Sequence, residues 1–383
     1  MTNWKEINLG DAATFVNGYP FKPSDWSIKG DEIIRIQNLT KSSKEANYFE
    51  GEIAEKYKVR KGDLLISWSA TLGIYEWEGE DAWLNQHIFK VVFNKKEFDK
   101  NFFKYLISYL LDELGQEVHG ATMKHITKKK FDAVQIPFPP LATQKKIAAI
   151  LDAADAHRQK TKQLLAKYEE LAQSIFLEMF GDPVTNPKGW EYRKLDDSLK
   201  FMTSGSRGWA KHYSDTGSIF LRIQNIGYDE LRLDDITYVN APENAESKRT
   251  EVQSGDVILT ITADLGRTAV IPMDFPKANI NQHLALLRLK SIYNPVFVSS
   301  YIASKGGQSQ FLKLDKGGVK AGLNFTDIRS FKVFSPPKDI QDSFAKRLES
   351  IENQKEQAKN SIEKANNLFN SLLQKAFKGE LVN

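Results

Sequence analysis

Histidine occurs in a repeated Asn-Gln-His motif, at residues 85–87 and again at 281–283, and imidazole is a common protein ligand for metal ions. A zinc site needs three or four ligands, but neither His87 nor His283 has a second ligand at a suitable spacing. The chain contains no cysteine, which excludes disulfides, thiol catalysis and Cys-ligated zinc. We therefore expect the motif to act structurally, in strand pairing, and we predict no metal site.

Proline pairs also occur twice, in the tetrapeptides that begin at Phe138 and at Ser335. Both are similar to the site in which adenine methyltransferases hold a flipped base, but that site needs an aromatic fourth residue to stack on the base. Here the fourth residues are Leu141 and Lys338, and no glycine-rich loop for S-adenosylmethionine precedes either copy. The proline pairs are better explained as the end of a strand and the start of a helix. We predict no catalytic residue and no cofactor bound by this chain.

The composition of the chain limits its class. A length of 383 residues predicts two or three domains. Lysine and arginine number 53 against 49 acidic residues, a net charge of +4. Because neutralisation of phosphates dominates non-specific affinity for DNA, so balanced a chain is expected to hold DNA poorly without a partner. No stretch approaches the roughly 20 apolar residues of a membrane span, and the N-terminus has no signal pattern, so we expect a soluble, cytoplasmic protein.

The second half of the sequence repeats the first roughly 190 residues later, a period far longer than that of solenoid repeats. Arg35-Ile36-Gln37-Asn38 returns at residues 222–225, and Gly62-Asp63 returns as Gly255-Asp256. Each copy therefore corresponds to a whole domain followed by a connector. We predict domains at residues 1–140 and 181–336, with connectors at 141–180 and 337–383.

Both domains mix short apolar runs, which predict strands, with one stretch of helical periodicity. The elements occur in the same order in both copies, which indicates two mixed α/β domains. In the first copy the predicted strands are residues 33–37, 64–68, 87–93 and 133–138, with a helix at 98–114. In the second copy they are residues 219–224, 257–262, 283–289 and 331–335, with a helix at 296–312.

The connectors carry the clearest periodicity of the chain, with seam residues that alternate steps of four and three. Such a repeat over more than four heptads favours coiled-coil pairing over a lone amphipathic helix, which would present a broader apolar face. Because the second helix starts at the second domain, pairing along its length requires the two helices to be antiparallel. The residues predicted to pair the helices are Ile147, Leu151, Leu165, Ile175, Phe344, Leu348, Ile362, Phe369 and Leu372.

In this arrangement the chain resembles the specificity subunits of type I restriction-modification systems. The resemblance covers essentially the whole length and rests on features that occur twice, a strand with Pro-Pro-x-x-x-Gln ending at Gln144 and Gln341 and a helical spacer ending near residues 171–176 and 368–373. It also rests on the link that begins at Phe180-Gly181-Asp182-Pro183. Each motif is weak alone, but the same order found twice is specific.

The resemblance implies a non-catalytic protein that reads a split, asymmetric target on double-stranded DNA. It implies two pseudo-twofold-related target-recognition domains joined by two long antiparallel helices, with one half-site for each domain. It further implies that two methyltransferase subunits and, in the full complex, two restriction subunits bind this chain. S-adenosylmethionine and ATP are then expected only on those partners.

Polar loops that differ between the two copies are the candidates for DNA contacts, because residues that both copies keep are expected to be scaffold. Hydroxyl, carboxylate and guanidinium groups suit base edges, and lysines suit phosphates. The candidates in the first copy are Lys22, Trp26, Trp68, Ser69, Thr71, Lys124, His125 and Lys128. Those in the second copy are Arg207, Trp209, Lys211, Thr262, Asp264, Arg267, Lys320 and Asn324. For each of them, plain solvated surface is the simpler alternative.

Two other classes of protein fit parts of the sequence. A self-contained DNA methyltransferase is opposed by the missing cofactor loop, and a cofactor-binding assay on the purified chain would test it. A coiled-coil adaptor that binds proteins through both heads is the other alternative, and DNA binding by the assembled complex would eliminate it.

Overall fold

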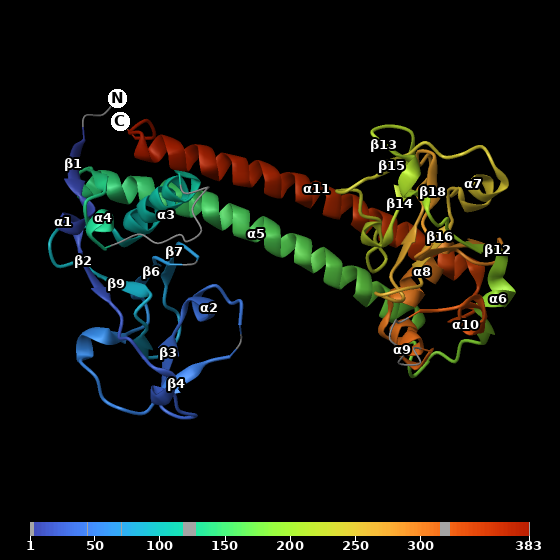
Figure 1. The fold of residues 1–383 in the computed structure, drawn as a ribbon, viewed down its shortest axis with the longest axis horizontal. Helices are drawn as coiled ribbons and strands as arrows, with labels where there is room; N and C mark the ends of the chain where they lie inside the picture. The colour runs from blue at the N-terminus through green and yellow to red at the C-terminus, as the bar shows by residue number, and fades with distance from the viewer. Residues whose placement is uncertain (1–3, 44, 70, 118–127, 315–321, 383) are drawn as a thin grey trace. The chain divides into compact units, whose positions relative to one another are not determined.

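The computed structural model describes residues 4–43, 45–69, 71–117, 128–314 and 322–382. The chain divides into two compact units. Unit 1 comprises residues 1–163 and 359–383, and unit 2 comprises residues 164–358. Within the described residues, each unit contains two four-stranded sheets and one two-stranded ribbon, whose elements are labelled in Figure 1.

In unit 1 the first sheet has the order β2-β9-β6-β7 and the second the order β4-β3-β8-β5, in which β3 and β8 are parallel. One face of the first sheet packs on helix α3 through Phe89, Phe102 and Phe103, and its other face meets the second sheet at Leu65 and Leu84. The strands are β1 (Lys5–Asn8), β2 (Thr14–Asn17), β3 (Asp31–Ile34), β4 (Asn47–Phe49), β5 (Lys58–Val59), β6 (Leu64–Ser67), β7 (Gly73–Glu76), β8 (Ala82–Leu84), β9 (Ile88–Val92) and β10 (Gln135–Phe138). The helices are α1 (Leu9–Ala12), α2 (Ile36–Leu39), α3 (Lys100–Glu117) and α4 (Lys128–Asp132).

Unit 2 repeats this plan with the sheets β12-β19-β16-β17 and β13-β15-β14-β18, in which β14 and β18 are parallel. Its first sheet packs on helix α8 through Leu259, Leu287 and Phe297, and it meets the second sheet at Leu221 and Leu286. The strands are β11 (Tyr192–Lys194), β12 (Leu199–Ser204), β13 (Tyr213–Ser214), β14 (Ser218–Leu221), β15 (Tyr238–Val239), β16 (Val257–Thr260), β17 (Thr268–Val270), β18 (Ala278–Ile280), β19 (Leu284–Leu289) and β20 (Lys332–Phe334). The helices are α6 (Leu195–Ser198), α7 (Ala245–Thr250), α8 (Pro295–Ala303), α9 (Lys305–Leu314) and α10 (Phe325–Ser330).

Two of the predicted strands end earlier than the apolar runs at 33–37 and 219–224 indicate. Strand β3 ends at Ile34 and β14 ends at Leu221. The Asn38 side chain accepts a hydrogen bond from the backbone N–H of Arg35 at 3.0 Å, and residue 225 does the same for residue 222 at 2.9 Å. This local bond closes a helical turn directly after the strand, so Ile36 and its counterpart leave the ladder.

The prediction of one continuous helix at 296–312 is wrong, because α8 ends at Ala303 and α9 begins at Lys305. Ser304 between them is extended, with φ −64° and ψ 161°. A Cβ atom on Gly307 would lie 2.4 Å from the carbonyl oxygen of Tyr301. Glycine has a low helix propensity, and here its missing side chain permits the close approach of α9 to the end of α8. The apolar period of the sequence continues across Ser304, although the helix does not.

Helices α5 (Leu141–Phe180) and α11 (Lys338–Phe377) are 40 residues each. In unit 1, Ile147 and Leu151 of α5 share a core with Phe369 of α11. In unit 2, the ring centroids of Phe180 in α5 and Phe344 in α11 lie 5.3 Å apart. The early part of α5 thus meets the late part of α11 in unit 1, and the reverse holds in unit 2, so the pairing is antiparallel within each unit.

The seam residues of both helices are withdrawn from solvent. Four of those predicted to pair the helices are buried, namely Ile147, Leu151, Phe344 and Phe369. The other five are half-buried, namely Leu165, Ile175, Leu348, Ile362 and Leu372. In the described part of unit 1, this stripe continues into the core of the mixed domain, where Leu373 and Ala376 are also buried.

The first turn of each long helix contains a glutamine that both copies keep. The Gln144 side chain is fully buried, donates from Nε2 to the Pro139 carbonyl at 2.9 Å and accepts from the Asp99 N–H at 2.9 Å. Gln341 makes the equivalent bonds in unit 2. The glutamine therefore ties together the end of the last strand, the start of the long helix and the loop before α3 or α8.

We expect Gln341→Ala to lower the free energy of unfolding by about 2 kcal/mol, because it leaves the Pro336 carbonyl and the Asn294 N–H without their partner in a buried junction. Gln374→Ala is the matched control, since Gln374 is exposed on the same helix. The measurement is thermal unfolding of the full chain followed by circular dichroism. Equal midpoints for the two variants would contradict the role given to the buried glutamine.

Candidate nucleic-acid interface

An Asn-Gln-His turn joins the two four-stranded sheets of each unit. In unit 1 it connects β8 to β9, and in unit 2 it connects β18 to β19, where the Asn281 side chain accepts from the His283 N–H at 3.1 Å. A glycine backbone crosses each turn so closely that a Cβ atom on Gly18 would lie 2.0 Å from the Asn85 carbonyl oxygen, and one on Gly205 would lie 2.1 Å from that of Asn281. The repeated motif is therefore a crossing point between sheets.

A hairpin beside this turn has the same scaffold in both units. The Ser67 hydroxyl donates to the Thr71 carbonyl in the β6–β7 hairpin, and the Thr260 hydroxyl donates to the Asp264 carbonyl in the β16–β17 hairpin. Ile261 follows β16, and its backbone N–H donates to the carbonyl oxygen of His283 in the crossing turn at 3.0 Å. One backbone frame thus presents different side chains in the two units.

In unit 2 the tip of this hairpin is polar. Thr262 Oγ1 lies 2.7 Å from His283 Nδ1, and His283 Nε2 lies 3.0 Å from Gln282 Nε2. The exposed Asp264 carboxylate pairs with the Arg267 guanidinium at 2.8 Å. Hydroxyl, imidazole, carboxamide, carboxylate and guanidinium groups therefore lie on one hairpin and the turn beside it, and these are the groups that recognise base edges.

The corresponding tip of unit 1 is less polar. Trp68 is half-buried, and its ring stacks on Phe89 with centroids 5.4 Å apart and 18° between the planes. Ser69 is buried, whereas Thr71 and His87 are exposed. Trp68 and Ser69 thus pack into the unit, and Thr71 is the predicted residue that faces solvent on this hairpin.

Lys22 and Trp26 lie on the loop between β2 and β3. Lys22 is exposed, and its backbone N–H donates to the Asp25 carboxylate at 2.7 Å. Trp26 is 41% exposed, and the Arg35 guanidinium lies 5.2 Å from its ring centroid. Trp26 and Arg35 thus combine an exposed aromatic ring with a cation, a combination that suits stacking on a base or contact with a phosphate.

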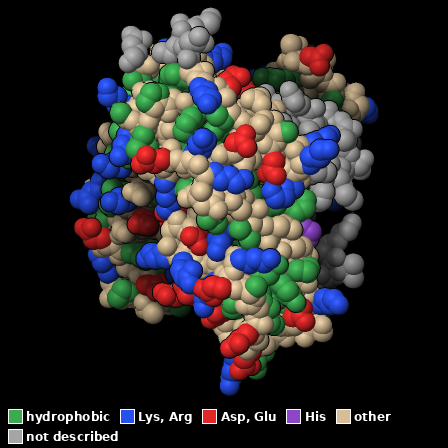
Figure 2. Space-filling model, turned by 90° about the vertical axis from the view of Figure 1, so that its left-hand side faces the viewer, with side chains coloured by type: hydrophobic (Ala, Val, Ile, Leu, Met, Phe, Trp, Pro, Cys, Tyr) green, Lys and Arg blue, Asp and Glu red, His purple; other side chains and the backbone are tan. Residues whose placement is uncertain are grey.

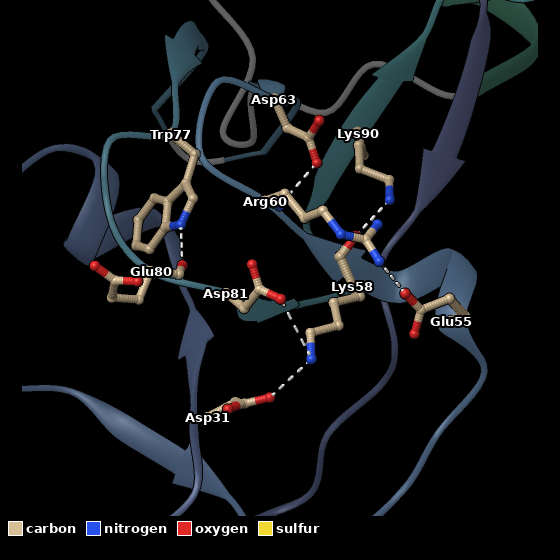
Figure 3. A network of polar contacts seen from close by, with 9 residues as sticks. All are labelled: Asp31, Glu55, Lys58, Arg60, Asp63, Trp77, Glu80, Asp81 and Lys90. Carbon is tan, nitrogen blue, oxygen red and sulfur yellow. Dashed lines mark hydrogen bonds and ion pairs between the residues drawn. The ribbon is translucent and has the colours of Figure 1, made fainter.

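A charge network on the second sheet of unit 1 satisfies its own cations (Figure 3). Lys58 Nζ lies 3.4 Å from the Asp31 carboxylate and 3.5 Å from that of Asp81, and Arg60 pairs with Glu55. Among the nine residues drawn, every lysine and arginine points to an oxygen acceptor. The network therefore stabilises the sheet and offers little free positive charge to a phosphate.

The loop after β12 in unit 2 is anchored by Trp209. Trp209 is buried, and its ring stacks on Phe220 with centroids 5.5 Å apart, in a small core with Val239. Arg207 and Lys211 on either side are exposed. Trp209 therefore holds the loop that presents these two cations, and it does not itself face solvent as the sequence comparison predicts.

The remaining predicted contacts divide into three groups. Lys128 is exposed at the start of α4 and pairs with Asp132 at 2.6 Å. The Asn324 side chain caps α10 by accepting from the backbone N–H groups of residues 326 and 327, so its carbonyl oxygen is already engaged. Lys124, His125 and Lys320 lie outside the described residues.

Sequence comparison misses Tyr228, which is 55% exposed and whose ring centroid lies 5.7 Å from the Arg267 guanidinium. The loop that carries it pairs with Thr268 at the start of β17. This loop follows the turn at residues 222–225 and does not align with the first copy. A comparison of aligned positions could not reveal Tyr228. The signal that could have indicated it is an aromatic residue in a polar loop that has no counterpart in the first copy.

The described residues hold neither a cluster of three or more metal-ligating His, Cys, Asp or Glu side chains nor a helix long and apolar enough to cross a membrane. On the face that Figure 2 shows, basic and acidic side chains are interspersed, in keeping with the balanced composition. Two similar units that present different hairpin tips on one scaffold are typical of a recognition protein.

Comparison with known proteins agrees with this class. The family model described as the type I restriction modification DNA specificity domain matches residues 1–170 and 187–365. The chain therefore belongs to this family of DNA specificity proteins. It is the non-catalytic subunit that recognises the target sequence within a type I restriction-modification complex.

Individual relatives are distant but span the chain. The chain is 25% identical to the EcoBI specificity subunit of Escherichia coli, over 99% of this chain and 86% of that one. It is 23% identical to the MjaVIII specificity subunit of Methanocaldococcus jannaschii, over 97% and 92%. The fold is similar to the S subunit from M. genitalium, with a TM-score of 0.56, 14% identity and coverage of 98% and 96%. It is also similar to a chain solved in a study of assembly and conformational transition of the type I R-M system, with a TM-score of 0.62, 17% identity and coverage of 100% and 99%.

Proposed function

We propose that this chain reads a split, asymmetric target on double-stranded DNA, one half-site with each unit. The observation that carries the proposal is the shared hairpin with different tips, Thr71 beside packed aromatic residues in unit 1 and Thr262, Asp264 and Arg267 in unit 2. Because base edges are distinguished by their donors and acceptors, different tips select different base pairs. Two unlike reading surfaces therefore favour two unlike half-sites.

We assign the two recognition domains to residues 1–140 and 181–336 and the helical spacers to residues 141–180 and 337–383. This division is supported by the bounds of the long helices, because α5 begins at Leu141 and α11 begins at Lys338. The residues that we assign to DNA contact are Lys22, Trp26, Thr71, Lys128, Arg207, Lys211 and Asp264, which are exposed, and Thr262 and Arg267, which are half-buried. Lys124, His125 and Lys320 complete this set on the basis of the sequence alone.

We also propose that two methyltransferase subunits and, in the full complex, two restriction subunits bind the chain in the cytoplasm. The near balance of charge supports this dependence, since 53 basic against 49 acidic residues supply little general attraction to phosphates. S-adenosylmethionine and ATP belong to those partners in this proposal.

The test is to express the chain with its partner methyltransferase in a host without endogenous DNA methylation and to sequence the modified bases. We expect a bipartite motif with unlike halves, which is lost when either the chain or the methyltransferase is omitted. Methylation by the chain alone, or an undivided or symmetric motif, would contradict the proposal.

A further inference from the structure

We infer that Arg267 selects a G·C base pair in the half-site read by unit 2, and that Tyr228 positions its guanidinium group. This inference rests on the proposed function and adds to it one residue's base preference and one positioning residue. Arg267 occupies the first position after the kept Leu265-Gly266 of the hairpin, where unit 1 has Ile74 after Leu72-Gly73. The guanidinium is thus a feature of unit 2 on a scaffold that both units share.

The guanidinium of Arg267 is held between two neighbours. It pairs with the exposed carboxylate of Asp264 at 2.8 Å and lies 5.7 Å from the ring centroid of Tyr228. The Arg267 side chain is 24% exposed, whereas the Asp264 side chain is 58% exposed. The arginine is therefore pre-oriented beside an aromatic face, with its partner carboxylate on the solvent side.

The loop that carries Tyr228 is fixed to the hairpin by backbone hydrogen bonds. The Thr268 N–H donates to the Gly227 carbonyl at 3.0 Å, and the Glu230 N–H donates to the Thr268 carbonyl at 3.0 Å. Because Thr268 follows Arg267 in the chain, these bonds set Tyr228 alongside Arg267. The aromatic ring is exposed, but its backbone is held in place.

A second clamp ties this loop to helix α8. The Asp229 carboxylate accepts hydrogen bonds from the hydroxyl groups of Ser299 and Ser300. Ser299 Oγ also lies 3.0 Å from Thr268 Oγ1, which connects the clamp to the hairpin strand. Asp229 adopts φ 58°, a backbone conformation that needs such support. These contacts hold the backbone beside Tyr228 in place, while its ring stays exposed to solvent.

This geometry fits the chemistry of guanine recognition. A planar guanidinium donates two parallel hydrogen bonds to O6 and N7 of guanine, and a carboxylate can accept from the amino group of cytosine. An ion pair whose carboxylate faces solvent, such as that of Asp264 and Arg267, contributes little in water, so exchanging it for a base edge has a small cost. The cation–π contact with the Tyr228 ring limits the movement of the guanidinium during that exchange.

The experiment uses the full complex of this chain with its methyltransferase on a library of randomised targets, read by sequencing of modified DNA. We expect Arg267→Ala to weaken the preference at one G·C position of one half-site by roughly ten- to a hundred-fold, with the other half-site unchanged. Tyr228→Ala should weaken the same position less. Arg232→Ala is the control, because Arg232 lies on the same loop as Tyr228 and also pairs with a carboxylate, that of Glu230 at 2.8 Å, but its side chain is more exposed, at 45% against 24% for Arg267.

The outcomes separate the inference from the proposed function on which it rests. An unchanged motif in Arg267→Ala, or relaxation at an A·T position, would overturn the assignment of Arg267 to guanine. A uniform, salt-dependent loss across all targets would make Arg267 a phosphate contact and overturn it as well. Loss of all methylation in Arg267→Ala, with the full motif kept in Arg267→Lys, would also overturn it, because lysine lacks the guanidinium fork. An undivided motif in the unmodified complex would instead refute the proposed function.

Discussion

Leu286→Lys is expected to destabilise unit 2 by about 4 kcal/mol, because it places an ammonium group in a core without an acceptor for it. Leu286 is fully buried between the two sheets of unit 2, in a cluster with Leu221 and Ile258. Unit 1 has Lys90 at the equivalent position, three residues after the crossing turn. There Nζ reaches the carbonyl oxygen of Lys58 (Figure 3), so the charge keeps a partner.

The measurement is unfolding of the full chain by denaturant, with Leu368→Lys as the control, since Leu368 is 52% exposed on α11. In the assembled complex, Leu286→Lys should impair sequence selection at the half-site of unit 2 more than at the half-site of unit 1. A midpoint equal to that of Leu368→Lys would show that unit 2 can supply an acceptor, contrary to the packing described above.

Gly205→Ala is expected to cost about 3 kcal/mol or more, because the new Cβ would lie 2.1 Å from the carbonyl oxygens of both Ile280 and Asn281. These are backbone atoms at the point where the chain passes from one sheet to the other, so neither can move without separating the sheets. Gly18→Ala makes the same test in unit 1, where the nearest carbonyl oxygen, that of Asn85, would be 2.0 Å away.

Both glycine variants can be followed by thermal unfolding and by sequencing of the bases that the assembled complex methylates. We expect each variant to impair sequence selection at the half-site that its own unit reads. Gly208→Asn is the control: Gly208 has φ 69°, which asparagine tolerates, and a Cβ there meets no atom within 4 Å. If Gly205→Ala melts with the control, the crossing turn has more freedom than the structure indicates.

The sequence alone determined the duplication, the class of protein and the course of the long helices. The helical seam could be read because a heptad repeat is a local property, and each seam residue is buried or half-buried in the structure. The early end of β3 was not predicted, because the hydrogen bond from the Arg35 N–H to Asn38 competes with the hydrogen bonds of the sheet. This competition does not change the pattern of apolar residues. The break at Ser304 was not predicted for a related reason, because the apolar pattern continues across it from α8 into α9.

The recognition surface was decided by tertiary structure. Aligned comparison found the hairpin tips because their scaffold repeats, but it could not tell that Trp209 turns inward onto Phe220. It could not find Tyr228, whose loop has no aligned counterpart and meets Arg267 only through pairing with Thr268. Composition shows which groups could contact a base, but burial and long-range backbone pairing determine which of them face solvent, because both depend on residues far away in the chain.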